Sequence, residues 1–379
     1  MPGFEPVLEA FEEAFEGHPE MGAALAVRVD GESVVDVWGG YADAREGRPW
    51  ESGTLGVVFS CTKGLMSILA AQLVQRGLLD YDAPVAQYWP EFAAAGKQST
   101  TVRDLLAHRA GLSALRQPLT TEQMLDWGTV TAALAEQEPL WEPGARHSYH
   151  PITHGWLIGE VVHRVTGLMP GEAFQQFIAE PLGAPAWIGL PDELQARVAH
   201  LTVGPTLRTV IAEGLDRAPV DGPDWPTLGM TMGGALPLSL AEDGAGFNDP
   251  RVRAAQIPGA GGVMTARSLA RIWSATVVED GGVRLLGPEV LEDALPVRSE
   301  GAPYFDAPPP WPRWGSGFQR DSEARRYLGE ASFGHDGAGG QVAFADPEHR
   351  VGFAFITNWM EAVDPRATRI VDALRECLA

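Results

Sequence analysis

The sequence has 379 residues and a formal net charge of −22 at pH 7. Nucleic acids and anionic membrane surfaces bind proteins through clustered Lys and Arg, so this charge argues against both as partners. The two cysteines, Cys61 and Cys377, are too few for a disulfide framework, and no Cys/His cluster has the spacing of zinc ligands, so we expect neither a metal nor another cofactor.

The N-terminal residues do not have the pattern of a targeting segment. Residues 1–5 include neither a basic region nor a continuous apolar run. No later stretch reaches the roughly 18 apolar residues that a membrane-spanning helix needs. We therefore expect a cytoplasmic protein with no membrane partner.

The chain is predicted to begin with a helix and a β-hairpin. Two β-rich runs, 23–29 and 33–38, are separated by the turn dipeptide Asp30-Gly31. Before them, apolar residues recur at helical spacing with glutamates between them, at Phe4, Val7, Leu8, Phe11 and Phe15.

The middle of the chain is predicted to be mainly helical. A helix opens at Ser60 and ends near Gly77, and helical periodicity returns at 102–108, 122–137 and 154–166. From about 201 to 262 the pattern loosens into segments rich in Pro and Gly, such as 218–223 and 232–234, which predicts long loops. Loops of that length usually line a site.

The C-terminal part is predicted to return to strands. A helix at 265–277 precedes the stiff Pro-rich segment 307–312, which suits neither a helix nor a central strand. Residues 341–345 and 351–357 form a second hairpin, and 365–378 form a closing helix.

Strands at both ends of the chain, with helices between them, favour an α/β fold. We expect one antiparallel sheet that is built from both chain ends and flanked by helices, with an inserted, mainly helical region. The whole chain, 1–379, would be a single catalytic domain, whose α/β part is about 1–60 plus 260–379 and whose mainly helical part is about 61–259.

Ser60 and Lys63 carry the clearest chemical signal. If Ser60 opens a helix, Lys63 lies one turn further on the same face, with the two Cβ atoms roughly 5–6 Å apart. A lysine can take the serine proton only if its pKa is lowered, and the apolar residues on both sides of the pair could bury it. Only two of the 28 basic residues are lysine, and an arginine could not serve as a base. The alternative is an N-capping serine with a surface lysine.

Two further clusters are ambiguous when each is taken alone. Residues 141–150 follow a Pro-Gly turn, and Tyr149 there is either a core residue or a cleft residue, while nearby histidines leave a triad base open. Residues 332–340 contain glycines that indicate either a close approach of backbone or a flexible bend. Cys61 is interpreted as a small packing residue, with a cysteine nucleophile as the alternative.

The three clusters together resemble the three motifs of the penicillin-recognising serine hydrolases, in the same order. These are Ser60-Cys61-Thr62-Lys63, Tyr149 in a Pro-Gly-x-x-x-x-Tyr setting, and His335-Asp336-Gly337 before a strand. The family includes class C β-lactamases, D-alanyl-D-alanine carboxypeptidases and family VIII carboxylesterases. The segments 105–112, 155–160 and 261–267 are also similar to the family, so the resemblance covers most of the chain and implies a β-lactamase/transpeptidase-like fold.

The resemblance implies roles for these residues. Ser60 would be the nucleophile, and Lys63 and Tyr149 would share the work of taking its proton and delivering it to the leaving group. The backbone N–H groups of Ser60 and Ala338 would hold the oxyanion, and His335 would lie on the edge strand beside the site, where Asp336 and Gly337 also contribute to substrate binding.

Two departures from the family pattern favour esters as substrates. Penicillin-processing members usually carry Asn two residues after the tyrosine and Lys-Thr-Gly as the third motif, whereas this sequence has Pro151 and His335-Asp336-Gly337. A neutral His335 is a poor receptor for a carboxylate. With Trp311 and Trp314 lining the pocket, the interpretation is a family VIII-like carboxylesterase of short-chain or aromatic esters. The alternatives are a transacylase of the same family, a β-lactamase or D-aminoacyl peptidase, and a catalytically silent binding protein.

Overall fold

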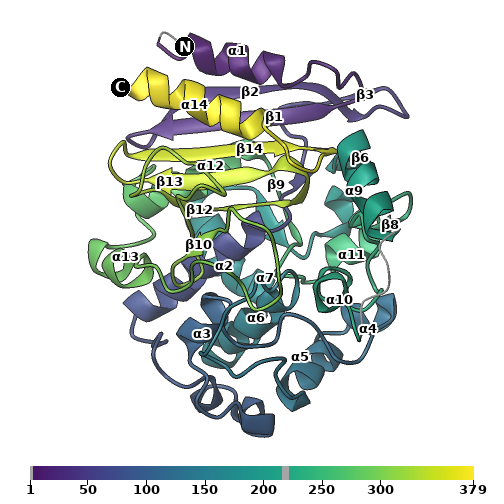
Figure 1. Cartoon of the computed structure of the whole chain (residues 1–379). Coiled ribbons are helices and arrows are strands. Elements are labelled where there is room, and N and C mark those ends of the chain that lie inside the picture. The colour runs from purple at the N-terminus through teal and green to yellow at the C-terminus, as the bar shows by residue number, and fades with distance from the viewer. Residues whose placement is uncertain (1–2, 216–221) are drawn as a thin grey trace.

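The computed structural model describes residues 3–215 and 222–379, and its centre is an eight-stranded antiparallel sheet (Figure 1). The strands lie in the order β10-β11-β12-β13-β14-β1-β2-β3. Their bounds are β1 (Gly22–Val29), β2 (Glu32–Asp43), β3 (Arg48–Pro49), β10 (Arg313–Trp314), β11 (Gln319–Arg320), β12 (Phe333–Asp336), β13 (Val342–Asp346) and β14 (Val351–Thr357).

The sheet joins the two ends of the chain, as the sequence predicts. β1 and β2 form the N-terminal hairpin, β13 and β14 form the C-terminal hairpin, and β14 pairs with β1 so that Leu25 lies opposite Phe355. The predicted fold class is therefore confirmed. The proposed boundaries of a helical part within a single domain stay a prediction.

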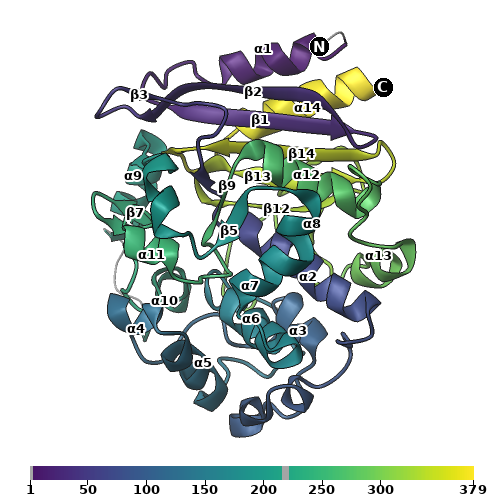
Figure 2. The same cartoon turned by 180° about the vertical axis from the view of Figure 1, so that it is seen from behind.

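Helices cover both faces of the sheet. α1 (Glu5–Glu13) and α14 (Arg366–Leu378) lie side by side on one face, near both termini, and α12 (Ala266–Val277) packs on the other face (Figures 1 and 2). Successive β1 residues point to opposite faces, so Leu25 joins the core under α1 and α14 while Ala24 and Ala26 join the larger core on the α12 side.

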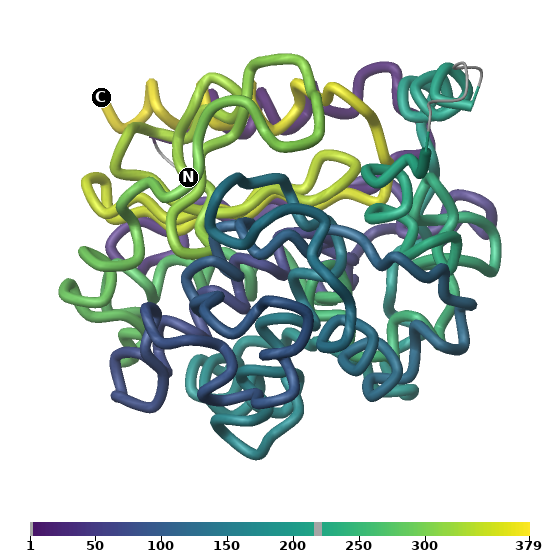
Figure 3. The backbone as a smooth tube through the Cα atoms, turned by 60° about the horizontal axis from the view of Figure 1, so that its bottom comes forward, coloured from purple at the N-terminus to yellow at the C-terminus, as the bar shows by residue number. Residues whose placement is uncertain are grey.

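The remaining helices form a region beyond the α12 face. Seen from below in Figure 3, much of this region, coloured blue and teal, lies in front of the sheet. The remaining helices are α2 (Cys61–Gln75), α3 (Val102–Leu106), α4 (Thr121–Leu125), α5 (Trp127–Glu136), α6 (Thr153–Thr166), α7 (Pro170–Phe174), α8 (Glu180–Leu182), α9 (Pro205–Leu215), α10 (Trp225–Thr231), α11 (Pro250–Ala254) and α13 (Pro288–Ala294).

Smaller elements complete the chain. β4 (Gly56–Val57), β9 (Gly262–Met264) and β5 (Ala186–Ile188) form a three-stranded sheet, and β6 (Thr202–Val203) pairs with β15 (Trp359–Met360), as β7 (Ala241–Glu242) does with β8 (Ala245–Gly246). Short 3₁₀ turns are η1 (Val85–Gln87), η2 (Pro90–Gly96), η4 (Asp192–Arg197) and η5 (Ala338–Gly340), and η3 (Gln175–Ala179) is a π turn. No helix within residues 3–215 and 222–379 is long and apolar enough to cross a membrane.

One predicted helix is two helices. The periodicity at 122–137 predicts a continuous helix, but the chain breaks at Asp126, which has the extended angles φ −87° and ψ 111°. The Asp126 side chain accepts hydrogen bonds from the backbone amide and the hydroxyl of Thr129, at 2.7 and 2.5 Å. An aspartate that caps α5 therefore ends α4 as well.

The prediction of long loops from 201 to 262 is also wrong, because α9, α10 and α11 lie within that range. Each of these helices carries a proline at its first or second position: Pro205, Pro226 and Pro250. Proline is tolerated in the first turn, where its missing N–H would have no partner inside the helix. Residues 216–221, which include most of the Pro-Gly segment 218–223, lie outside the described part of the chain.

Candidate active site

Ser60 lies at the start of α2, against strand β9. The backbone amide of Val58 donates to the carbonyl of Gly262 (2.9 Å), and the Gly262 amide donates to Thr62 Oγ1 (2.9 Å). Phe59 has a positive φ of 44°, which turns the chain sharply just before the serine. The Ser60 hydroxyl makes no capping hydrogen bond, so the position is fixed by contacts on both sides of it rather than by the serine itself.

Lys63 reaches Ser60 from inside the protein. Its side chain is fully buried, and Nζ lies 2.9 Å from Ser60 Oγ, 2.5 Å from the Pro151 carbonyl and 2.7 Å from the Gly259 carbonyl. Burial holds the pKa of Lys63 well below its ordinary value. No carboxylate in the described part of the chain forms an ion pair with it. The alternative of a capping serine beside a surface lysine is therefore wrong.

Because its pKa is lowered, Lys63 can become a neutral amine, and its contacts accommodate that form. An uncharged amine has two N–H groups and one lone pair. The two carbonyls can accept the two N–H groups, which leaves the lone pair directed at the Ser60 hydroxyl. This arrangement can accept the serine proton.

Tyr149 lies beside Ser60 and Lys63. Its ring stacks on Trp314, with centroids 5.5 Å apart and planes at 16°, and Lys63 Nζ lies 5.0 Å from the ring centroid. Burial raises the pKa of Tyr149 above its ordinary value, and a hydrogen bond with the Ser60 side chain opposes part of that rise. Tyr149 is therefore a protonated donor within reach of Ser60.

Three buried histidines, His108, His150 and His154, lie behind Tyr149. His150 Nδ1 donates to the Ser148 carbonyl (2.7 Å) and Nε2 accepts from the Leu112 amide (3.1 Å). Burial lowers the pKa of His150 to about 3 and holds the pKa values of the other two well below the ordinary value. Among the described residues, none of these three histidines forms a hydrogen bond with Ser60. The geometry therefore does not support a histidine as the base of a catalytic triad.

Strand β12 brings the third motif to the site. His335 is buried, and its Nδ1 donates to the Asp336 carbonyl (2.7 Å), which leaves Nε2 as an acceptor. Burial lowers the pKa of His335 to about 3, so the ring is neutral. Asp336 points to the opposite face, where its carboxylate accepts from Arg325 Nε (2.5 Å) and from the Tyr327 hydroxyl (3.3 Å).

Gly337 and Gly64 allow neighbouring segments to approach the Ser60 region closely. A Cβ atom on Gly337 would lie 2.4 Å from the Val58 carbonyl, and one on Gly64 would lie 2.6 Å from Trp273 and 3.2 Å from His335. Cys61 Sγ donates to the His335 carbonyl (3.1 Å), and burial raises the pKa of its thiol. The environment of Cys61 therefore fits a packing residue and disfavours a thiolate nucleophile.

Ser60 and Ala338, whose backbone amides are the predicted oxyanion donors, line the same hollow. Neither amide donates to another protein group among the described residues. This hollow, the Ser60 pocket, has a volume of about 350 Å³ and is lined by Phe59, Ser60, Tyr149, Pro151, Ile152, Met230, Leu240, Ala260, Pro312, Trp314, Gln319, His335, Asp336, Gly337 and Ala338. It therefore brings together every predicted site residue except Lys63, which lies beneath it, and Trp311.

Trp311 lines an adjoining hollow of about 330 Å³, the Trp311 pocket. The two pockets share five residues: Tyr149, Pro151, Met230, Pro312 and Trp314. Trp314 thus borders both pockets, and Trp311 lies only in the outer one. No Lys or Arg is among the lining residues of either pocket, all of which are described.

Sequence reasoning missed the groups that hold Lys63. The carbonyls of Pro151 and Gly259 have no signal in the sequence, because every residue has a carbonyl. Met230 on α10 was also missed. The sequence predicts its segment to be a loop that lines a site, but nothing in the pattern singles out this residue. The described residues include no group of three or more His, Cys, Asp or Glu placed to hold a metal ion.

The fold and the site define a serine hydrolase with a β-lactamase/transpeptidase-like architecture. A family model described as Beta-lactamase matches residues 9–375. The protein "Esterase/beta-lactamase LipL" of Mycobacterium tuberculosis (strain ATCC 25618 / H37Rv) is 35% identical over 361 residues, which cover 94% of this chain and 81% of that protein. The chain belongs to the β-lactamase family.

Solved structures agree with this assignment. The crystal structure of a family VIII carboxylesterase is similar with a TM-score of 0.87 and 34% identity, covering 100% of this chain and 98% of that one. A penicillin-binding protein homologue from Caulobacter crescentus is similar with a TM-score of 0.86 and 36% identity, again over 100% and 98% of the two chains. The predicted resemblance to the penicillin-recognising hydrolases is confirmed.

Proposed function

We propose that the protein is a serine carboxylesterase that hydrolyses short-chain or aromatic esters through an acyl-enzyme on Ser60. The observation that carries the proposal is the buried Lys63 amine, 2.9 Å from Ser60 Oγ and with two backbone carbonyls as its other partners. An enzyme of the β-lactamase family with this pair is a serine hydrolase, and the esterases among its relatives support esters as the substrate class.

The acylation half of the reaction follows from the geometry. Lys63 takes the proton of Ser60 as Oγ attacks the ester carbonyl, and the amides of Ser60 and Ala338 donate to the oxygen that becomes negative. Tyr149 then gives its proton to the leaving alkoxide as the C–O bond breaks. The proton held by Lys63 restores the tyrosine hydroxyl.

Deacylation uses the same groups in the reverse direction. A water molecule takes the place of the alcohol, loses its proton to the Lys63 and Tyr149 pair and attacks the acyl carbon. The same two amides hold the second oxyanion, and Ser60 leaves with a proton. The products are the carboxylic acid and the free enzyme.

The two pockets favour uncharged substrates. Their lining is mainly aromatic, proline and aliphatic, and it includes no Lys or Arg among the described residues. His335 is neutral, and the carboxylate of Asp336 is already paired with Arg325. A substrate carboxylate would be buried here without a cation, which is costly. Esters of neutral alcohols and phenols fit this environment.

The nucleophile is tested with Ser60→Ala. Activity on p-nitrophenyl esters should fall by about 10³-fold or more while the fold is retained, because only the attacking oxygen is lost. Ser67→Ala is a matched control, since Ser67 lies on the same helix with its hydroxyl on the Lys63 carbonyl (2.8 Å). Mass spectrometry after an organophosphonate should show one adduct, on Ser60. An adduct on another serine, or a fully active Ser60→Ala, would contradict the mechanism.

A β-lactamase is the second candidate, because the relative LipL is described as both an esterase and a β-lactamase. A β-lactamase usually has a cation and a side-chain amide beside the acyl group, whereas an esterase of neutral substrates does not need them. Pro151 offers only its carbonyl, which Lys63 already occupies. Nitrocefin turnover measured beside the ester panel separates the two candidates.

A further inference from the structure

The turn that carries the proposed oxyanion donor has a backbone that needs outside support. η5 (Ala338–Gly340) joins β12 to β13, and Gly339 and Gly340 have positive φ angles of 77° and 110°. A Cβ atom on Gly339 would lie 2.8 Å from Met360, and one on Gly340 would lie 2.0 Å from the Asp364 carboxylate. The turn is therefore pressed against the segment that leads into α14.

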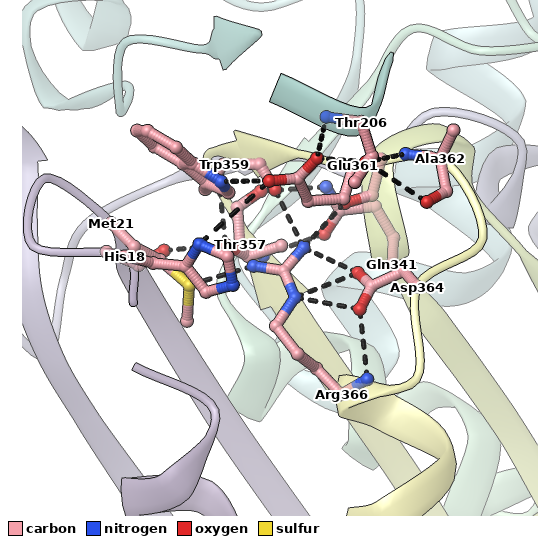
Figure 4. Close-up of polar contacts among 12 residues, drawn as sticks. His18, Met21, Thr206, Gln341, Thr357, Trp359, Glu361, Ala362, Asp364 and Arg366 are labelled. Atoms are coloured by element: carbon pink, nitrogen blue, oxygen red, sulfur yellow. Dashed lines mark hydrogen bonds and ion pairs between the residues drawn. The ribbon is translucent and has the colours of Figure 1, made fainter. Parts of the chain in front are cut away.

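Arg366 binds this turn from the first residue of α14 (Figure 4). Its Nη2 donates to the Gly339 carbonyl (3.2 Å), the Trp359 carbonyl (2.9 Å) and Asp364 Oδ2 (2.5 Å). Nε donates to both oxygens of Asp364, at 2.8 and 2.9 Å, and Nη1 to the Met21 sulfur (2.8 Å). The Arg366 and Asp364 side chains are only 5% and 7% exposed, so the guanidinium is held in one orientation.

Gln341 holds the turn from the other side. Its side-chain amide exchanges two hydrogen bonds of 2.7 Å with the backbone of Thr357, and its carbonyl accepts from the Gly337 amide (2.8 Å). Figure 4 shows Gln341 and Arg366 in one polar cluster with Thr357, Trp359 and Asp364. The three residues Ala338–Gly340 are thus fixed at both ends.

We propose that Arg366 is a positioning residue for the oxyanion hole. By holding the Gly339 carbonyl, it fixes the direction of the neighbouring Ala338 N–H. The inference rests on the proposed function, in which that N–H holds the oxyanion. A donor stabilises the transition state only when it lies about 2.7–3.1 Å from the oxyanion, and loss of one donor costs on the order of 10²–10³ in rate. Two successive glycines cannot hold that direction unaided, because glycine restricts its backbone least.

The test uses the double variant Asp364→Asn/Arg366→Gln, which removes the buried charge pair as a unit. Arg366→Gln alone would leave Asp364 buried without a cation and can prevent folding. Arg28→Gln is the matched control, because Arg28 also binds a carboxylate, Asp280, and a backbone carbonyl, Gly31, but lines neither pocket.

The readout compares a p-nitrophenyl ester with the thionoester in which sulfur replaces the carbonyl oxygen. Sulfur is a weak hydrogen-bond acceptor, so the ratio of kcat for the ester to kcat for the thionoester reports on the oxyanion hole. The folded fraction affects both kcat values equally and cancels in this ratio. In the Asp364→Asn/Arg366→Gln variant, kcat for the ester should fall about ten-fold or more with KM little changed, and the ratio should fall with it. Arg28→Gln should leave the ratio unchanged.

The outcomes separate the inference from the proposed function. If the folded double variant keeps the oxygen-to-sulfur ratio of the unmodified enzyme, Arg366 is structural only and the inference fails. If the unmodified enzyme forms no phosphonate adduct on Ser60, the proposed function fails. An adduct on Ser60 with a lowered ratio in the double variant supports both.

Discussion

At the scale of single residues, the amine of Lys63 is matched to its surroundings by size and by charge. Two carbonyls and one hydroxyl surround it at 2.5–2.9 Å, with no carboxylate in the described residues to keep it charged. A guanidinium is planar, larger and charged at every working pH. The site therefore selects lysine for the chemistry that a neutral amine can perform.

Lys63→Arg should be nearly as damaging as Lys63→Ala. Both variants lose the base, and arginine keeps a charge that cannot accept the serine proton, so kcat should fall by about 10²-fold or more in each. Steady-state kinetics on p-nitrophenyl acetate would measure the fall, with circular dichroism as the check on folding. If Lys63→Arg keeps most of its activity, Lys63 is an electrostatic support and Tyr149 is the sole base.

His335→Lys should shift substrate choice toward carboxylate-bearing compounds. The neutral ring would be replaced by a cation that can pair with a substrate carboxylate. We expect KM for esters with a carboxylate to fall relative to KM for neutral esters, with nitrocefin hydrolysis still slow because Pro151 has no side-chain amide. The unmodified protein should hydrolyse nitrocefin negligibly. A kcat/KM for nitrocefin comparable to that of its best ester would contradict the proposed specificity.

At the scale of elements, spacing in the sequence could predict contacts between residues that are close in the chain, but not contacts between residues that are far apart in it. Ser60 and Lys63 are three residues apart on one helix, so their meeting could be predicted from spacing. The carbonyls of Pro151 and Gly259 lie 88 and 196 positions from Lys63, and backbone acceptors leave no trace in composition. The helices α9, α10 and α11 were missed because a proline in the first turn has the same local appearance as a proline in a loop.

Gly64→Ala should disturb the packing of α2 against α12 and β12. The new methyl group would lie 2.6 Å from Trp273 and 3.2 Å from His335, both of them buried, so the helix that carries Ser60 and Lys63 must shift. Overpacking of this kind costs typically 1–3 kcal/mol. We expect a lower free energy of unfolding in urea and a lower kcat.

Gly128→Ala on α5 provides the control. The nearest atom to its new methyl group would be an Asp126 oxygen at 3.7 Å, and Gly128 is exposed. Alanine is favoured over glycine in a helix by about 1 kcal/mol, so this variant should be as stable as the parent or more so. If the Gly64→Ala protein has the stability and activity of the Gly128→Ala protein, the packing around Gly64 accommodates a methyl group and the prediction is wrong.

At the scale of the whole molecule, the sheet from both chain ends and the helical region meet at a site that contains four buried, neutral histidines. His108, His150, His154 and His335 are at most 2% exposed, and burial lowers the pKa of each. Unfolding exposes these rings to water, where the histidine pKa is about 6.5. The folded protein therefore binds fewer protons than the unfolded chain as the pH falls below that value.

This difference makes stability depend on pH with a definite sign. For His150, whose folded pKa is about 3, the stabilising effect of its neutral form is complete above about pH 6.5 and is lost as the pH falls toward about 3. The loss is about 1.4 kcal/mol per pH unit for each such histidine. Urea unfolding of His150→Asn between pH 6 and 4 should show a slope smaller by about that amount than the parent. Equal slopes in the parent and in His150→Asn would mean that His150 does not hold its neutral form in the folded state.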